Sequence, residues 1–151
     1  MKNKLKIREY TIHDKAQLIE ILQLNVPEYF HEDEVDDFKK YLDTELELYF
    51  VGEINGKIVG AGGINFEKNY SVGKISWDFI NPNFQGIGLG RELLKHRINF
   101  LKNTKSIKVI SVRTSQLAYK FYEKNGFVLK EIVKDYWAKG FDMYSMIYEK
   151  L

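Results

Sequence analysis

The chain has 151 residues, of which 44% are hydrophobic and 29% are charged, and its formal net charge at pH 7 is only +2. This profile is typical of one soluble globular domain, and so small a charge gives no reason to expect nucleic acid as a partner. Cysteine is absent, which excludes disulfides, thiolate nucleophiles and Cys-ligated zinc. No apolar run approaches the ~20 residues of a membrane span, and the first ten residues lack the apolar stretch of a signal peptide. We therefore expect a single cytoplasmic domain over residues 1–151, with no membrane partner.

The first third of the chain predicts one strand followed by two helices. Leu5 to Tyr10 alternates charged and apolar residues, as a half-buried strand does. Apolar residues with helical spacing follow Thr11, and Pro27 ends that segment. A second amphipathic helix is expected from about Glu32 to Leu42.

Strand patterns dominate the middle of the chain. Leu46 to Ile54 and Lys57 to Phe66 are joined by Asn55-Gly56, which is the strongest short signal for a hairpin turn. Ser71 to Ile80 is a third predicted strand, and Asn81-Pro82-Asn83 stops it. These three strands form an antiparallel meander.

The last third of the chain alternates helices and strands. The expected elements are a helix from Leu89 to Leu101, a strand from Ser106 to Val112, a helix from Gln116 to Lys124, and a hairpin of Val128 to Trp137 with Phe141 to Glu149. The element order predicts a mixed α/β (α+β) sheet with helices on its faces rather than a doubly wound parallel fold. The C-terminal strand is a candidate edge for pairing with a second copy, so a homodimer is one candidate assembly.

The densest chemical signal is a glycine-rich turn, NPNFQGIGLGR, from Asn81 to Arg91. Its glycines, Gly86, Gly88 and Gly90, lie between an apolar strand and an amphipathic helix. Glycine lets the backbone turn tightly and expose N–H groups at a helix N-terminus, where the dipole also favours an anion. We therefore predict a phosphate or pyrophosphate site, with a glycine turn that binds nothing as the alternative. The Walker pattern and the G-x-G-x-x-G dinucleotide pattern both fail here.

A second motif lies about 30 residues further along, SQLAYKFYEKNGF, from Ser115 to Phe127. Together the two segments resemble the GCN5-related N-acetyltransferase (GNAT) family, whose motifs are [Q/R]-x-x-G-x-[G/A] and N-x-x-A-x-x-F-Y-x-x-x-G-F. The matching residues are Gln85, Gly88, Gly90, Ala118, Phe121, Tyr122, Gly126 and Phe127. Ser115 stands where the family usually has Asn, which weakens the expected side-chain contact with the cofactor there.

This resemblance implies a GNAT-like acyl-CoA N-acyltransferase fold, with a central mostly antiparallel sheet and helices on both faces. It implies acetyl-CoA as the co-substrate and no metal. The strands Ser71 to Ile80 and Ser106 to Val112 would separate, with pantetheine between them. The residues implied to bind the cofactor are Phe79, Ile80, Gln85, Gly86, Ile87, Gly88, Leu89, Gly90, Arg91 and Ser115.

The resemblance also implies an acetyl transfer to a primary amine, and the absence of cysteine supports direct attack within a ternary complex. Tyr122 occupies the family's Tyr position and is our candidate for the acid that protonates the departing thiolate; the alternative is a packed core aromatic. Asp78 is the candidate base, because its apolar neighbours would raise the pKa of its carboxyl, although a structural carboxylate is the alternative. Some family members have a Glu where this chain has Lys74, and His31 and Glu32 are further candidates for the base.

The acceptor site is implied to lie between Asn25 to Glu34 and Tyr136 to Tyr144. The first segment begins a run of acidic residues that contains no Lys or Arg up to Asp37. Acidic and aromatic residues together suit a cationic amine, while solvated acids at a helix N-terminus are the alternative. The acceptor classes left open are a small amine, an amino acid, a peptide or protein N-terminus, and a lysine. Two rival functions also remain, a noncatalytic acyl-CoA-binding sensor or regulatory module and a phosphate-binding domain for another nucleotide.

Overall fold

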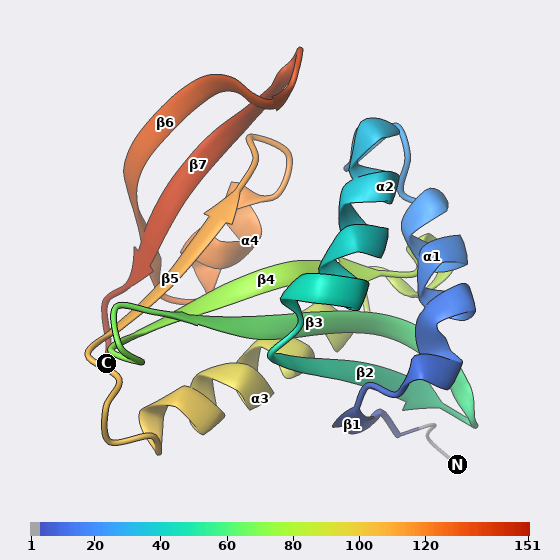
Figure 1. Cartoon of the computed structure of the whole chain (residues 1–151), viewed down its shortest axis with the longest axis horizontal. Coiled ribbons are helices and arrows are strands. Elements are labelled where there is room, and N and C mark those ends of the chain that lie inside the picture. Colours follow the sequence, from blue (N-terminus) through green and yellow to red (C-terminus); the bar gives the residue numbers. More distant parts are fainter. Residues whose placement is uncertain (1–3) are drawn as a thin grey trace.

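The computed structural model describes residues 4–151. Residues 1–3, which belong to the ten-residue segment expected not to be a signal peptide, lie outside the described residues. Seven strands form one sheet in the order β1-β2-β3-β4-β5-β7-β6 (Figure 1). Every neighbouring pair is antiparallel except β4 and β5. The strands are β1 (Lys6–Glu9), β2 (Leu48–Ile54), β3 (Lys57–Glu67), β4 (Val72–Ile80), β5 (Val109–Thr114), β6 (Phe127–Ala138) and β7 (Phe141–Tyr148). The predicted fold class is confirmed.

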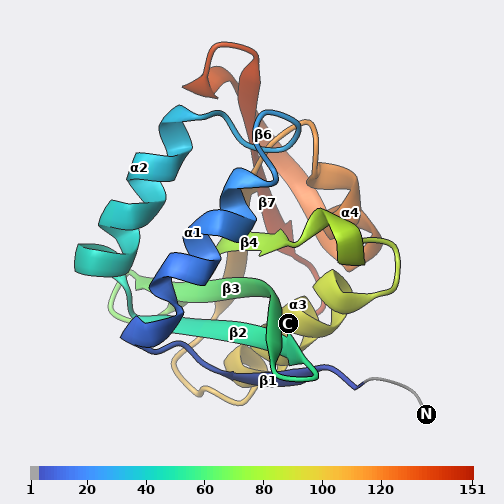
Figure 2. The same ribbon diagram turned by 90° about the vertical axis from the view of Figure 1, so that its right-hand side faces the viewer.

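Helices cover both faces of the sheet, with α1 and α2 on one face and α3 on the other (Figures 1 and 2). The helices are α1 (Lys15–Gln23), α2 (Asp33–Lys40), α3 (Leu89–Lys102) and α4 (Tyr119–Lys124). Leu18 and Phe38 pack in one apolar cluster with Val51, while Leu94 of α3 packs in the other with Ile64 and Ile75. The alternation of side chains along the strands thus supplies a separate core to each helical layer.

Several predicted boundaries differ from the observed ones, and two of them differ by three residues for a local reason. The strand expected at Ser106 begins at Val109, because residues 104–107 form a turn closed by a hydrogen bond from Ile107 N to Thr104 O. The helix expected at Gln116 begins at Tyr119, because Ser115 accepts hydrogen bonds from the three residues that precede or begin it. The second helix ends as an α-helix at Lys40 and continues as a π-helical turn, Tyr41–Glu45.

A bulge in β4 interrupts the regular pairing of the sheet. Ala61 pairs with Phe79 and Gly63 pairs with Ser76, so two steps along β3 oppose three steps along β4. The extra residue leaves Trp77 with a φ of 46°, in the left-handed region. Beyond this point β4 leaves β5, since their pairing stops at Ile75.

A buried tyrosine hydroxyl holds the bulge in place. Tyr49 Oη donates a hydrogen bond of 2.7 Å to the backbone carbonyl of Trp77. Tyr49 is only 2% exposed, so no bulk water replaces this partner. A buried side chain thus donates to a backbone carbonyl at the bulge itself.

One edge strand of the sheet is β1, and the other is β6 rather than the last strand of the chain, β7. β7 pairs with β5 on one side and with β6 on the other. The C-terminal strand is therefore not the edge that the sequence suggested for pairing with a second copy. In residues 4–151, no helix combines the length and the apolar character needed to cross a membrane.

Replacing Tyr49 by Phe should lower the free energy of unfolding by about 1–3 kcal/mol, because the Trp77 carbonyl loses its buried donor. Tyr10→Phe is the matched control, since the Tyr10 ring packs against Tyr49 at 6.0 Å and its buried hydroxyl has no partner within residues 4–151. The control should be neutral or stabilising. Urea unfolding of both variants measures the difference, and equal losses would contradict a role for the Tyr49 hydrogen bond.

Candidate active site

The separation of β4 from β5 opens a cavity of about 730 Å³. Its lining comes from β4, the turn before α3, β5, α4, the connection between α1 and α2, and the β6–β7 hairpin. In Figure 1 the helices α1 and α2 and the β6–β7 hairpin rise on opposite sides above β4. Parts of the chain that are far apart in sequence thus meet at one site.

The glycine-rich turn at one end of the cavity leaves space and free donors for an anion. Gly86 and Gly88 have φ values of 83° and 86°, and a Cβ atom on either would meet no heavy atom within 4 Å. Within residues 4–151, the backbone N–H groups of residues 86–91 make no hydrogen bond. These amides lie at the N-terminus of α3, which begins at Leu89, so the turn fits the pyrophosphate of a coenzyme A.

Nine of the ten residues expected to bind the cofactor line this cavity. Ile87 does not, and its side chain is 63% exposed. Phe79 and Ile80 lie on the part of β4 that has left β5, so their outer backbone edge borders the cavity. Asn25 Nδ2 donates to the Ile80 carbonyl at 3.1 Å, which ties the end of α1 to this strand. The Ser115 hydroxyl accepts a hydrogen bond from Leu117 N in the turn that precedes α4.

The two residues predicted to be catalytic, Tyr122 and Asp78, are in contact. Tyr122 Oη donates a 2.9 Å hydrogen bond to Asp78 Oδ2. Tyr122 is 5% exposed, and burial, followed by the nearby Asp78 charge, raises the pKa of its hydroxyl well above the usual value. The phenol therefore keeps its proton at neutral pH and is available as a donor.

Arg97 is a third member of this cluster, and the sequence analysis missed it. Its Nη2 lies 2.8 Å from Asp78 Oδ2 without the direction of a hydrogen bond, so the contact is an ion pair. Arg97 is fully buried and donates to the carbonyls of Leu93 and Gly63. A Cβ atom at Gly62 would come within 2.5 Å of the guanidinium, so only glycine leaves room for it there.

The two further candidates for the base, His31 and Glu32, form no hydrogen bond or ion pair with this cluster among residues 4–151, and neither does Lys74, which stands where some family members have a Glu. Lys74 lines the cavity, but it faces Glu67 at 3.4 Å. His31 accepts a hydrogen bond from Asp33 N through Nδ1, and its ring packs against Phe141 at 5.7 Å. Glu32 is exposed and does not line the cavity.

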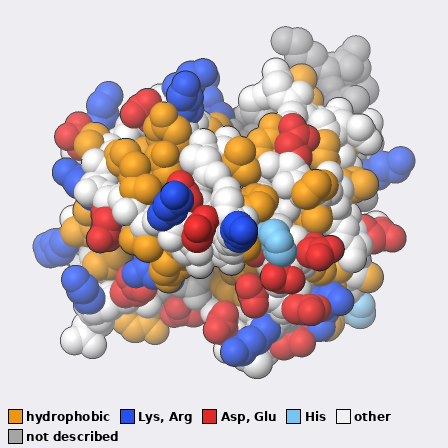
Figure 3. Space-filling model, turned by 90° about the horizontal axis from the view of Figure 1, so that it is seen from above, with side chains coloured by type: hydrophobic (Ala, Val, Ile, Leu, Met, Phe, Trp, Pro, Cys, Tyr) orange, Lys and Arg blue, Asp and Glu red, His pale blue; other side chains and the backbone are white. Residues whose placement is uncertain are grey.

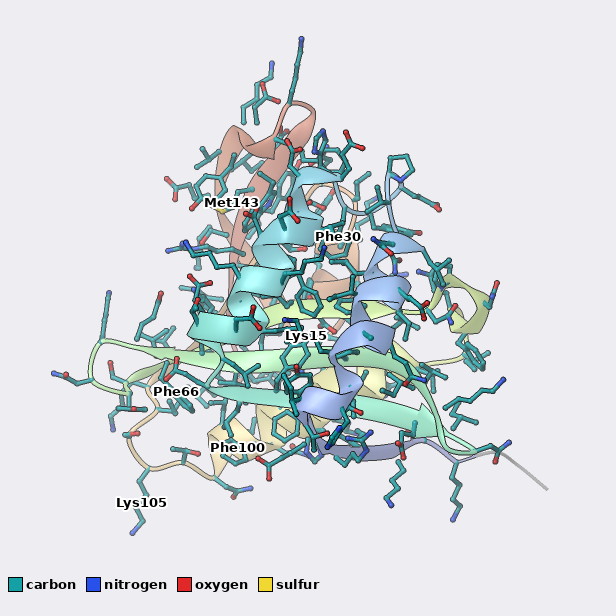
Figure 4. All side chains as sticks on the ribbon, turned by 45° about the vertical axis from the view of Figure 1, so that its right-hand side comes forward. Lys15, Phe30, Phe66, Phe100, Lys105 and Met143 are labelled. Atoms are coloured by element: carbon teal, nitrogen blue, oxygen red, sulfur yellow. The ribbon has the colours of Figure 1, made fainter. Side chains whose placement is uncertain are left out.

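Aromatic side chains form the other end of the cavity, where the acceptor site was predicted. These residues are Tyr29, Phe30, Trp77, Tyr136, Trp137 and Phe141. Phe30 lies at the connection between α1 and α2 (Figure 4), and its ring stacks on Trp77 at 6.2 Å. Trp137 Nε1 donates to the carbonyl of Thr114 at 3.0 Å, which fixes the hairpin over the end of β5. Both predicted segments therefore contribute to one chamber.

The acidic run between α1 and α2 divides into exposed and buried members. Five of its six carboxylates are exposed, and acidic side chains gather on the α2 side of the molecule in Figure 3. Three of the six lie in the first turn of α2, where the helix dipole favours them. Glu34 differs from the rest, because it is only 7% exposed and lines the cavity.

Comparison with known proteins places this site in a family. Residues 15–127 match the model of the acetyltransferase (GNAT) family. The chain is 26% identical to an N-alpha-acetyltransferase of Sulfolobus acidocaldarius, over 93% of this chain and 90% of the relative. A GNAT-family structure from Desulfovibrio desulfuricans superposes with a TM-score of 0.80 at 17% identity, covering 97% of this chain and 99% of the other. The structure of Naa50 of Arabidopsis thaliana in complex with a bisubstrate analogue superposes with a TM-score of 0.76 at 20% identity, covering 96% of this chain and 98% of the other.

The fold and the site define a coenzyme A-dependent acyltransferase. The chain belongs to the GNAT family, as its two motifs indicated, and it is an N-acetyltransferase that transfers acetyl groups to amines.

Gly88→Ala should weaken coenzyme A binding by at least about tenfold, because the new methyl group enters the open space beside the free amides. Gly56→Ala in the β2–β3 hairpin is the control, since Gly56 has a φ of 77° and equally open surroundings. Both variants should lose about 1–2 kcal/mol of stability, because both force alanine into the left-handed region. Calorimetric titration with coenzyme A separates them, and equal affinities would contradict a phosphate site at Gly88.

Arg97→Met should lower the free energy of unfolding by about 3–5 kcal/mol, because Asp78 is left buried without its cation. The double variant Asp78→Leu, Arg97→Met removes both charges and should recover most of that loss. Urea unfolding of the two proteins is the measurement. A double variant as unstable as the single one would show that packing, and not the uncompensated charge, causes the loss.

Proposed function

We propose that this enzyme transfers the acetyl group of acetyl-CoA directly to the α-amino group of a peptide or protein N-terminus. One continuous cavity supports this reading, because it joins an anion-binding turn to an aromatic chamber, and Tyr122 lines it. The N-alpha-acetyltransferase relative, similar over nearly the whole chain, agrees with an α-amine acceptor.

Acetyl-CoA supplies the acetyl thioester, and its pyrophosphate would be held by the backbone amides of residues 86–91. The separated edge of β4 at Phe79 and Ile80 offers backbone partners to the pantetheine arm. As the amine nitrogen bonds to the carbonyl carbon and the C–S bond breaks, Tyr122 Oη donates its proton to the departing thiolate, and the proton lost by the acylated nitrogen restores the phenol through solvent. To do so the hydroxyl must turn away from Asp78, because a phenol has only one proton to donate.

Arg97 makes this change of partner feasible. When the Tyr122 hydroxyl leaves, the Asp78 carboxylate keeps its ion pair with Arg97 at 2.8 Å. Asp78 is thereby a positioning residue for Tyr122, with Arg97 behind it. Its role as the base stays a prediction, since its Oδ2 is already in contact with both Tyr122 and Arg97.

The paired state of Asp78 is the observation that carries the choice of acceptor. Transfer needs a neutral amine, and Asp78 is the only carboxylate in contact with Tyr122 within residues 4–151. An α-amino group has a pKa of about 7.7–8.0 against ~10.4 for lysine, so at pH 7.5 its neutral fraction is roughly two hundred times larger. A site without a free base beside its acid therefore suits α-amines better than lysines.

Thiol release from acetyl-CoA tests the proposal on short peptides with a free N-terminus, on Nα-blocked peptides that contain lysine, and on small amines. We expect turnover with free N-termini, and Tyr122→Phe should lower kcat about 10²- to 10⁴-fold. Tyr119→Phe is the matched control on the same helix, because Tyr119 packs against Tyr144 and does not line the cavity. Preference for blocked lysine peptides would refute the α-amine acceptor, and full activity of Tyr122→Phe would refute the acid.

A further inference from the structure

Glu34 is a buried carboxylate that forms no ion pair within residues 4–151. It lies in the first turn of α2 and is 7% exposed. Its Oε2 accepts a 2.8 Å hydrogen bond from the backbone N–H of His31. Its Oε1 has no hydrogen-bond partner within residues 4–151, and the side chain borders the cavity. Half of the carboxylate is thus left for a group that enters this space.

Only two carboxylates, Asp78 and Glu34, line the cavity in the described part of the chain. Asp78 is neutralised by Arg97 and also accepts the Tyr122 hydroxyl. The cations that line the cavity, Lys74, Arg91 and Arg113, form no ion pair with Glu34. Glu34 is therefore the one carboxylate of the cavity that still lacks a cation among residues 4–151.

The rings around this end of the cavity are also suited to a cation. Phe30 and Trp77 line the cavity and stack on each other at 6.2 Å. The fully buried Phe38, one helical turn after Glu34, supports Trp77 at 5.1 Å without lining the cavity. The His31 ring, next to the backbone N–H that Glu34 binds, contacts Phe141 of β7. Aromatic faces attract cations, and the attraction is greatest where water is excluded.

We propose that Glu34, with the aromatic walls of the chamber, binds a positively charged group of the acceptor. This inference rests on the proposed function and adds the charge of the substrate to it. Two parts of a peptide acceptor carry such a group, the terminal ammonium itself as it arrives and a basic side chain beside it. The hydrogen bond from His31 N to Glu34 Oε2 stabilises the start of α2, but a glutamine accepts the same bond, so this structural role and the binding role can be separated.

Without a bound cation, the buried carboxylate of Glu34 lowers the free energy of unfolding. Burial raises the pKa of the Glu34 carboxyl, while the His31 amide acts in the opposite direction. A group whose pKa is raised on folding destabilises the native state above that pKa, and the effect disappears as the pH falls below the unfolded value. Glu34→Gln should therefore be at least as stable as the wild type at pH 7.5, and any gain should shrink on acidification.

The direct test measures binding of 2-phenylethylammonium and of its neutral analogue 2-phenylethanol to the protein saturated with coenzyme A. The wild type should bind the cation about tenfold more tightly, and Glu34→Gln should reduce that preference to less than about twofold. Asp36→Asn is the matched control on the same helix, because the Asp36 side chain is 91% exposed, and it should keep the wild-type preference. No preference in the wild type, or a full preference in Glu34→Gln, would overturn the proposal.

Peptide kinetics then distinguish the two sources of the charge. If the terminal ammonium is bound, Glu34→Gln raises the KM of every peptide acceptor alike and leaves the KM of acetyl-CoA unchanged. If a basic side chain is bound, the variant loses kcat/KM only for peptides with lysine at the second position and not for those with alanine there. The binding comparison needs no turnover, so it stays decisive even if peptide N-termini prove not to be the acceptors.

Discussion

The bulge at Trp77 is the constraint on which the site depends. One extra residue in β4 ends its pairing with β5, and the cavity occupies the space between the two strands. The same residue sets the directions of its neighbours. Trp77 packs with Phe30 and Phe38 on the face covered by α1 and α2, whereas the next residue, Asp78, reaches Arg97 of α3. A single local irregularity therefore supplies the wall of the acceptor chamber and the anchor of the proposed acid.

Two buried carboxylates of this cavity are treated in opposite ways. Asp78 is compensated inside the protein by Arg97, which Gly62 admits by having no side chain. Such a pair contributes little net stability, because desolvation offsets its attraction, but it gives the Tyr122 hydroxyl a fixed acceptor. Glu34 forms no ion pair within residues 4–151, and the amide of His31 offsets only part of its desolvation, so in our proposal the acceptor brings the missing cation. In the proposed function, the Asp78–Arg97 pair fixes the position of the Tyr122 hydroxyl, while the carboxylate of Glu34 binds the acceptor.

The regular elements and the cofactor turn were predictable from the sequence because their signals are local. Asn55-Gly56 encodes its hairpin, and the glycines before α3 encode a turn with positive φ. The bulge has no such signal, since neither glycine nor proline occurs at Trp77 or Asp78. Arg97 does have a local sequence signal, because it interrupts the apolar stripe of α3 between Leu93 and Leu101. Glu34 has such a signal too, since it lies four residues before the buried Phe38 on the same face of α2.

The two ends of the cavity have opposite electrostatic character, which suits each end to a different substrate. Free backbone amides at the start of α3 favour the phosphates of the cofactor, while Glu34 and the aromatic rings favour a cation. In the proposed function an anionic donor and a cationic acceptor would therefore enter from different ends and meet near Tyr122, whose hydroxyl keeps its proton. Acetylation converts an ammonium into a neutral amide, so a carboxylate that attracts the amine has no such attraction for the product. If the bound charge is the terminal ammonium, the carboxylate that selects the acceptor would therefore also favour release once the transfer is complete.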